Sequence, residues 1–225
     1  MVFNEVCSLG CNMHIAIIGA TGLVGSHLLK KLLANSRVEK VTTITRKSID
    51  HDSKKLSQIV LEKMDTQTIE NLEIDADVFF CGLGTTIKTA GSREAFSFVD
   101  HDLVVSFAVL AKKCQVKSLF IVSAMGANKK SKIFYNQVKG RMEEDIRALA
   151  LESTYFLHPS LLIGDRAEKR LGESIGVSLY NLLSGVVPVG VRSMLGTKVS
   201  DIVNFVESEI FNLKSGEQNV SKFES

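Results

Sequence analysis

The sequence feature that most constrains the fold is a glycine-rich turn that lies between an apolar run and an amphipathic segment, at residues 14–30. Residues 15–18 form an apolar run without polar alternation, which is typical of a strand buried on both faces of a parallel sheet. The leucines at positions 28, 29, 32 and 33 then follow helical spacing. The order strand, glycine turn and helix predicts a dinucleotide-binding α/β unit, although a plain strand-to-helix turn has the same pattern.

Each glycine of the turn has its own expected role. Gly19 permits the tight turn, Gly22 lets the backbone approach a pyrophosphate, and Gly25 lets the helix lie close to the strand. Free N–H groups at the start of the helix would hold the phosphates. The residues expected to bind the dinucleotide in this turn are Gly19, Thr21, Gly22, Leu23, Val24 and Gly25.

Length and composition limit the class of protein. A chain of 225 residues, 45% of them hydrophobic, suits one α/β domain with a sizeable core. The net charge of +2, with basic and acidic residues mixed, argues against a dedicated nucleic-acid binder. The cysteines and histidines have no metal-ligand spacing, so no metal site is expected. We find no signal peptide and no segment suited to membrane insertion, and therefore expect a cytoplasmic protein.

The pattern of the chain predicts a doubly wound parallel sheet of the Rossmann type. Strands are expected at residues 15–18, 40–45, 58–61, 77–81, 118–123 and 153–158, and further helices at residues 66–71, 92–114 and 133–149. Residues 1–12 are expected to form an N-terminal extension, 13–215 a single domain, and 216–225 a polar tail. From about residue 160 the pattern loosens into expected helices at 171–183 and 199–213 and a loop at 185–196, a short region suited to covering a substrate.

Residues beside the predicted crevice favour NADP(H) as the cofactor. Arg46 and Lys47 follow the second strand, where basic side chains accommodate a 2′-phosphate, although both could simply be surface charges. Asp65 could accept a hydrogen bond from the adenine amino group, or it could cap the next helix. A second glycine-rich turn, expected to lie next to the cofactor, comprises Gly82, Leu83, Gly84 and Thr85.

Three residues form a candidate catalytic set. Tyr135 and Lys139 are four residues apart on a predicted helix and therefore share a face, where the lysine could lower the pKa of the phenol and hydrogen-bond a nicotinamide ribose. Ser123 ends a predicted strand, where it could hydrogen-bond a substrate carbonyl oxygen. Tyr135 would then serve as the proton donor.

The combination of GATGLVG, the strand-terminal Ser123 and YNQVK resembles the short-chain dehydrogenase/reductase superfamily. The segments CGLGTTIKTAGSREAFSFVDHDLV, SAMGANKKSKIFYNQVKGRMEE and HPSLLIGDRAEKRLGE are similar to its atypical group that contains the Tat-interacting-protein-like oxidoreductases, over residues 13–213. The resemblance implies NADPH binding through the glycine turn and Arg46. The chain departs from this pattern at Asp100, where many extended members have asparagine, and at His158, where related members often have arginine.

These observations favour an NADPH-dependent oxidoreductase that reduces a small carbonyl compound through Ser123, Tyr135 and Lys139. An alternative is an NADPH-sensing regulatory protein with little or no turnover that binds a protein partner. A sugar-nucleotide epimerase shares the motif but usually has a larger C-terminal domain. The resemblance also implies a possible homodimer, whereas the sequence does not identify the substrate.

Overall fold

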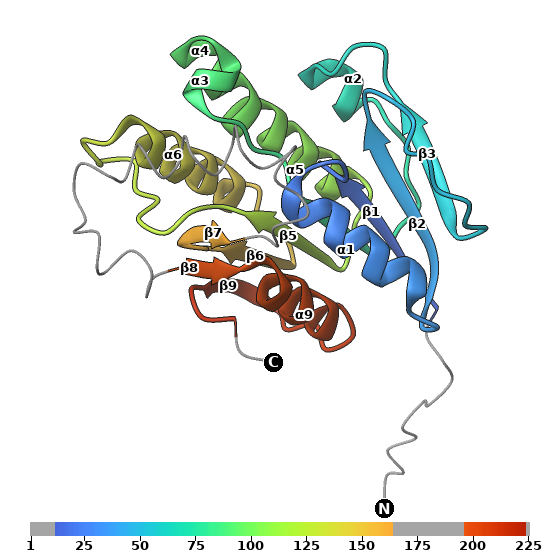
Figure 1. The fold of residues 1–225 in the computed structure, drawn as a ribbon. Coiled ribbons are helices and arrows are strands. Elements are labelled where there is room, and N and C mark those ends of the chain that lie inside the picture. The colour runs from blue at the N-terminus through green and yellow to red at the C-terminus, as the bar shows by residue number, and fades with distance from the viewer. Residues whose placement is uncertain (1–11, 164–195, 224–225) are drawn as a thin grey trace, which may run out of the picture.

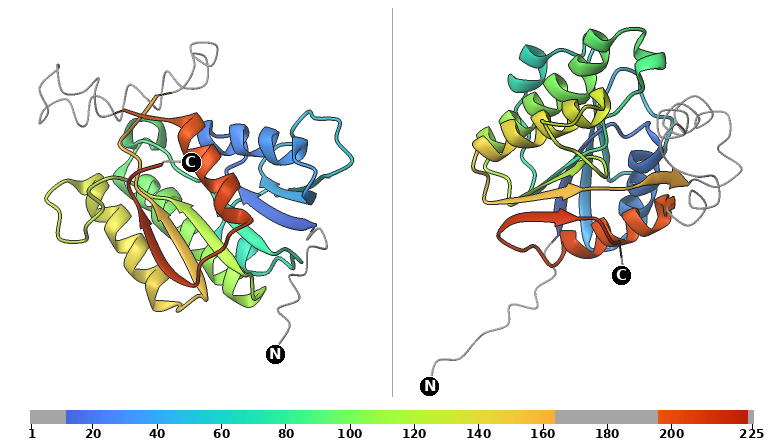
Figure 2. Two further views of the ribbon diagram at one scale, coloured as in Figure 1. Left: turned by 90° about the horizontal axis from the view of Figure 1, so that it is seen from below. Right: turned by 90° about the vertical axis from the view of Figure 1, so that its left-hand side faces the viewer.

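The computed structural model describes residues 12–163 and 196–223 (Figure 1). The expected helix at residues 171–183 and nearly all of the expected loop at 185–196 lie outside the described residues, as does most of the N-terminal extension. The described part is a central sheet with helices on both faces, and Figure 2 turns this arrangement to show the two helical layers. The doubly wound parallel sheet of the Rossmann type is therefore confirmed.

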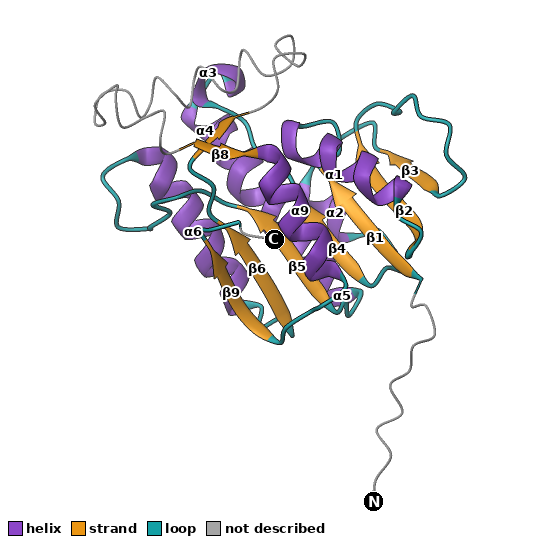
Figure 3. Ribbon diagram, turned by 60° about the horizontal axis from the view of Figure 1, so that its bottom comes forward, coloured by secondary structure: helices purple, strands orange, loops and turns teal. Residues whose placement is uncertain are grey.

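Seven parallel strands form the sheet, in the order β3-β2-β1-β4-β5-β6-β9 (Figure 3). Parallel pairing holds along the whole sheet; for example, Ile18 of β1 pairs with Ile44 of β2 and with Cys81 of β4. The strands are β1 (Met13–Ile18), β2 (Val38–Thr45), β3 (Leu56–Val60), β4 (Val78–Cys81), β5 (Ser118–Val122), β6 (Ser153–Leu157) and β9 (Gly216–Val220). A separate pair consists of β7 (Leu161–Ile163) and β8 (Gly196–Lys198).

The helices cover the sheet in two layers, because successive residues of a strand point to opposite faces. Ile15 and Ile17 of β1 join the core beneath one layer, and Ala16 and Ile18 join the core beneath the other. The first layer contains α1 (Leu23–Ala34) and α9 (Val199–Ile210). The second contains α2 (Thr66–Glu70), α5 (Leu103–Lys113) and α6 (Phe134–Ala148).

The long helix expected at residues 92–114 is instead divided. It comprises α4 (Arg93–Ser97), a π-helical turn η1 (Phe98–Asp102) and α5, and a further short helix, α3 (Ile87–Ala90), precedes it. The Leu103 N–H bonds to the Phe98 carbonyl oxygen five residues earlier, so the turn holds one more residue than an α-helical turn. Periodicity places Val99 on the buried face, but the wider turn buries Asp100 fully and leaves Val99 partly buried.

The expectation of a polar tail at residues 216–225 is wrong, because residues 216–220 form the edge strand β9 beside β6. Its polar composition fits an edge position, since one side of such a strand faces solvent. The Arg147 side chain of α6 bonds to Glu217 of β9 at 2.8 Å and so links the strand to a helix of the second layer. The sheet of the domain therefore extends beyond residue 215.

Candidate functional site

A cavity of about 110 Å³ lies at the carboxyl ends of β1, β4 and β5, where open α/β sheets bind their ligands. Its walls come from the first glycine turn and the start of α1, the second glycine turn after β4, the π-helical turn η1, the end of β5, helix α6, and the segment from the end of β6 to β7. The lining residues are Gly22, Leu23, Val24, Gly82, Leu83, Gly84, Thr85, Thr86, Asp100, Val122, Ser123, Ala124, Tyr135, Lys139, Pro159, Ser160 and Leu162.

Close backbone contacts explain two glycines of the first turn. Gly19 has φ +84°, and a Cβ atom there would lie 2.5 Å from the carbonyl carbon of Gly82. A Cβ atom at Gly25 would lie 2.2 Å from the Gly19 carbonyl oxygen. The structure thus bears out the tight turn at Gly19, whereas Gly25 lets helix α1 lie close to that turn rather than to the strand itself. The two glycine turns also pack against each other.

The start of α1 is open toward the cavity. Gly22 occupies the N-cap position and supplies no side-chain cap, and the first turn of the helix contains no acidic residue. The first N–H groups of a helix have no partner within the helix, and its dipole favours an anion there. This arrangement fits a dinucleotide phosphate, with Leu23 and Val24 at the cavity wall.

Lys139 forms a buried ion pair that the spacing of the motif does not predict. Its Nζ atom lies 3.0 Å from Oδ1 of Asp100 and donates to the Val122 carbonyl oxygen at 3.3 Å. Burial acts to lower the pKa of Lys139, but the Asp100 carboxylate outweighs this effect, so the pKa lies above its ordinary value. An ammonium has three N–H donors, and Val122 accepts from one of them, so a donor remains for a ribose hydroxyl.

Tyr135 stands one helical turn before Lys139 and lines the same cavity. Within the described residues, its hydroxyl has no hydrogen-bond partner. Burial raises the pKa of Tyr135, Lys139 opposes this effect, and Asp100 adds to it. The expectation of a phenol pKa lowered toward neutrality is therefore wrong, because burial and the Asp100 carboxylate outweigh the lysine.

Ser123 lines the cavity, but its hydroxyl donates a hydrogen bond to Oε1 of the buried Glu143. The same oxygen is bonded to Nε2 of His158 at 2.8 Å, and the other carboxylate oxygen to Arg147 at 3.2 Å. A serine hydroxyl has a single proton to donate. In this structure that proton is directed to Glu143, so the expected bond to a substrate oxygen requires the hydroxyl to rotate.

Other predicted site residues lie outside the cavity wall. Arg46 and Lys47 are exposed beyond the end of β2, and Thr21 is exposed in the first glycine turn. Asp65 caps α2 by accepting from the Thr68 N–H at 2.8 Å, and it pairs with Lys63 at 2.9 Å. Of the two roles open for Asp65, the structure therefore supports the helix cap.

The cavity also contains residues that were not expected in the site, above all Asp100, Thr86 and Leu162. Asp100 stood out in the sequence only as a departure from a family pattern, since a helical period does not reveal a π turn. Glu143 lies behind the cavity, and its four-residue spacing from Lys139 was a signal that could have placed it on the same helix face.

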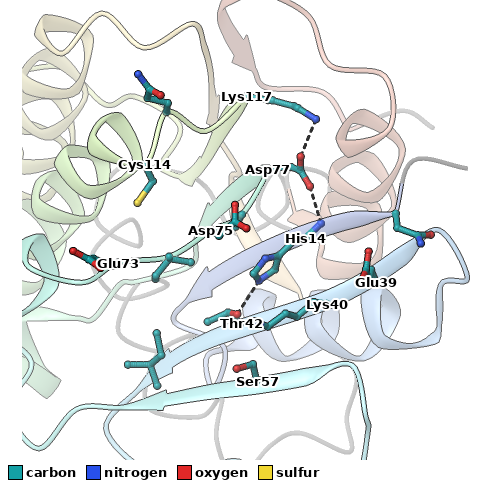
Figure 4. Close-up of a pocket in the computed structure, with 15 residues that line it drawn as sticks. His14, Glu39, Lys40, Thr42, Ser57, Glu73, Asp75, Asp77, Cys114 and Lys117 are labelled. Atoms are coloured by element: carbon teal, nitrogen blue, oxygen red, sulfur yellow. Dashed lines mark hydrogen bonds and ion pairs between the residues drawn. The ribbon is translucent and has the colours of Figure 1, made fainter. Parts of the chain in front are cut away.

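A larger hollow of about 780 Å³ lies at the opposite, amino ends of the strands (Figure 4). There the Asp77 carboxylate accepts from the His14 backbone N–H at 2.9 Å and pairs with Lys117 at 2.8 Å, while His14 Nε2 bonds to Thr42. No group of three metal-ligating side chains occurs in the described parts of the chain, there or elsewhere. The smaller cavity is the candidate site, because it contains both glycine turns together with Ser123, Tyr135 and Lys139.

Fold and cavity together define a Rossmann-type dinucleotide-binding protein. A family profile described as NAD(P)H-binding matches residues 19–174, so the chain belongs to this NAD(P)H-binding family. The match spans both glycine turns and the Ser123, Tyr135 and Lys139 set. Among the helices in residues 12–163 and 196–223, none is long and apolar enough to cross a membrane.

Relatives of the chain carry the name FMP52. The mitochondrial protein FMP52 of Eremothecium gossypii is 38% identical over 173 residues, which cover 76% of this chain and 77% of that protein. The mitochondrial protein FMP52-1 of Scheffersomyces stipitis is 34% identical over 217 residues, 94% of each chain. Because these relatives are named mitochondrial, the expectation of a cytoplasmic protein is wrong. None of these names is that of a Tat-interacting protein.

Solved structures with the same fold include two proteins in complex with UDP-glucose. MoeE5 in complex with UDP-glucose and NAD has a TM-score of 0.69 and 16% sequence identity, with 93% of this chain and 76% of that chain covered. The UDP-glucose 4-epimerase of Thermotoga maritima has a TM-score of 0.66 and 16% identity, with 94% and 78% covered. At this identity the likeness shows the Rossmann-type fold.

Proposed function

We propose that the protein is an NADPH-dependent oxidoreductase of the short-chain dehydrogenase/reductase type that reduces a small carbonyl substrate. The observation that supports this proposal most strongly is the convergence of Ser123, Tyr135 and Lys139 on one cavity beside two glycine turns. The narrower relationship to Tat-interacting-protein-like oxidoreductases is part of the proposal. An epimerase is a weaker alternative, since the solved epimerase and MoeE5 chains extend beyond the part that this chain covers.

The residues of this cavity divide the reaction between them. Bound NADPH supplies the hydride for the carbonyl carbon. Tyr135 donates the proton to the developing alkoxide, and Lys139 holds the ribose with its remaining N–H donor. Ser123 turns from Glu143 to donate to the same oxygen. A protonated phenol is the form that this direction of the reaction requires, and the raised pKa of Tyr135 supports it.

NADPH rather than NADH is proposed because Arg46 and Lys47 are exposed immediately after β2, free to contact a 2′-phosphate. Calorimetric titration of the purified protein with NADPH and NADH tests this choice. We expect tighter NADPH binding, which Arg46→Gln weakens while NADH binding stays unchanged. Lys54→Gln, an exposed change before β3, serves as the control. Equal affinity for both dinucleotides would refute the preference, and binding of neither would refute the proposed function.

The chain after about residue 160 is proposed to cover the substrate. Pro159, Ser160 and Leu162 line the cavity, and strand β7 of the pair β7–β8 begins at Leu161. This position supports a cover over the reacting end of the cavity. Leu162→Ala is then expected to raise the KM for the carbonyl substrate more than the Kd for NADPH, and the opposite ranking would contradict the assignment.

We propose a mitochondrial location on the basis of the relatives named mitochondrial. Cell fractionation of the untagged protein tests it, with protease protection of intact mitochondria to separate internal from surface-bound protein. Recovery in the soluble cytosolic fraction alone would overturn this proposal.

A second function, an NADPH-sensing protein with little turnover, is favoured by one observation: the Ser123 hydroxyl is engaged by Glu143 rather than directed into the cavity. In this function NADPH occupancy would alter a surface for a protein partner or a second copy. Affinity capture with and without NADPH, together with light scattering for the homodimer, tests it. A partner set and a molar mass that do not respond to NADPH would count against it.

A further inference from the structure

Helix α4 and the π-helical turn η1, which are continuous, meet helix α6 through two contacts that are one helical turn apart. The Phe96 ring of α4 lies 5.6 Å from the Tyr135 ring, centroid to centroid. Four residues later on each element, Asp100 and Lys139 form their ion pair at 3.0 Å. The spacing from Phe96 to Asp100 thus matches that from Tyr135 to Lys139, and both members of the catalytic pair are held by the same neighbouring element.

Asp100 is built into this position from several sides. Its side chain is 1% exposed, its Oδ2 atom accepts from the Thr85 backbone N–H at 2.8 Å, and its Oδ1 atom faces Lys139. A Cβ atom at Gly84 would lie 3.6 Å from Oδ1, so the second glycine turn closes around the carboxylate. A single π turn inside a helix is a rare local structure that occurs frequently at functional sites.

We propose that Asp100 is a positioning residue that neutralises the Lys139 ammonium and thereby keeps Tyr135 in its protonated, proton-donating form. This inference rests on the proposed function for its chemical meaning. A lone ammonium beside a phenol favours the phenolate, the form suited to accepting a proton from an alcohol. Because Asp100 compensates its charge, Lys139 can still bind the cofactor ribose but stabilises the Tyr135 phenolate much less. Tyr135 therefore stays protonated, which is the form that carbonyl reduction requires.

The other ionisable groups around Lys139 and Asp100 do not change the balance of charge between these two side chains. Burial raises the pKa of the Cys81 thiol of β4 to about 12, so the thiol facing the pair is neutral. Glu143 lies one turn further along α6, where its carboxylate is bonded to Ser123, His158 and Arg147. Asp100 is therefore the carboxylate that acts on both Lys139 and Tyr135.

Spectroscopic titration of Tyr135 tests the proposal without substrate or cofactor. The chain has three tyrosines and no tryptophan, so tyrosinate absorbance is measured on a clear background. The step that disappears in Tyr135→Phe belongs to Tyr135. In Asp100→Asn, whose amide oxygen can still accept from Thr85, we expect this step to move to lower pH by about one unit or more, because the ammonium is no longer compensated.

Asp102→Asn, on the same turn but with a side chain that is 47% exposed, is the matched control and should leave the step unchanged. A Tyr135 step that stays in place or moves upward in Asp100→Asn would overturn the proposal. If Asp100→Asn does not fold, Lys139→Met is compared with the double variant lacking both charges. The step should then lie higher in Lys139→Met, which retains the carboxylate, and equal steps would also overturn the proposal.

The outcomes for this proposal and for the proposed function are distinguishable. A protein with the expected shift that reduces no small carbonyl compound would refute the reductase function and leave the electrostatic role of Asp100 standing. An active reductase in which Asp100→Asn leaves the titration of Tyr135 unchanged would support the reductase function and refute the role of Asp100. In an active enzyme, Asp100→Asn should also move the pH profile of reduction to lower pH, which a merely structural role would not do.

Discussion

At the scale of single residues, the phenol of Tyr135 is the most exacting test of the proposed chemistry. Tyr135→Phe removes the proton donor while the ring still packs against Phe96, so we expect carbonyl reduction to fall by roughly 10²-fold or more with NADPH affinity largely unchanged. Initial rates on a panel of small aldehydes, ketones and quinones, with NADPH calorimetry, measure both quantities.

Tyr155→Phe is the matched control for that change, because it deletes the same atom outside the cavity. The Tyr155 hydroxyl donates to Glu209 at 3.1 Å and accepts from the Lys214 N–H at 2.9 Å. Its loss should cost about 1 kcal/mol of stability and leave reduction intact. Near-normal turnover in Tyr135→Phe would rule out the proposed acid.

A second property at the scale of single residues is the pH dependence of stability, to which His14 contributes. Burial, followed by the charge of Lys40, lowers the pKa of His14 below its ordinary value of 6.5. The unfolded chain therefore binds the proton first, so the stabilising contribution is present above pH 6.5 and is lost as the pH falls through the lowered pKa. Urea unfolding on both sides of pH 6.5 should show this loss, and His14→Gln should flatten it.

His51→Gln is the control for His14, since His51 is exposed in the loop before β3. It should leave the pH dependence of the free energy of unfolding as in the wild type. A wild-type protein whose stability is the same above and below pH 6.5 would contradict the role assigned to His14.

At the scale of elements, the π turn makes a prediction of its own. Deleting Val99 would restore α-helical register and place His101, in place of Asp100, four residues after Phe96. Lys139 would then face no carboxylate, and we expect a loss of about 3–5 kcal/mol, the usual cost of breaking a buried ion pair. Denaturant unfolding measures this loss.

Deleting Asp102 instead is a control of equal length. It also removes the additional residue of the turn, but Asp100 stays four residues after Phe96. The deletion should cost much less stability than the loss of Val99. If the two deletions destabilise the protein equally, the cost comes from the helix register and not from the ion pair.

The elements also show what the sequence could and could not predict. The sequence predicts β1, β4 and the glycine turn. A strand buried on both faces requires apolar residues, and a close contact between backbone segments requires glycine, so both restrict the residue type directly. The Asp100–Lys139 ion pair could not be predicted from the sequence, since it depends on a π turn that periodicity does not reveal. Likewise, the hydrogen bond from Ser123, at the end of β5, to Glu143 of α6 joins residues far apart in the sequence, so no local spacing predicts it.

At the scale of the whole molecule, the edge strand β9 is expected to protect the sheet. Truncation after residue 215 removes its pairing with β6, including the His158 N–H bond to the Val220 carbonyl oxygen at 2.7 Å. The β6 strand then becomes an exposed edge, so we expect a lower Tm and faster aggregation. Thermal scans followed by light scattering measure both effects.

Truncation after residue 223 is the control, because it keeps β9 and the Phe223 ring that packs on Phe205 of α9. This shorter truncation should leave the Tm and the aggregation rate near those of the full chain. If truncation after residue 215 proves equally harmless, β9 contributes little to the stability of the sheet.

The position of β9 also bears on how the protein is made. Among the strands of the described sheet, β9 is synthesised after all the others, and it pairs with β6 only after α9 has been made. During synthesis the nascent chain therefore carries an open edge at β6, beside the partly assembled cavity. A chaperone that prevents aggregation of the nascent chain therefore has this interval in which to act, before β9 covers the edge of β6.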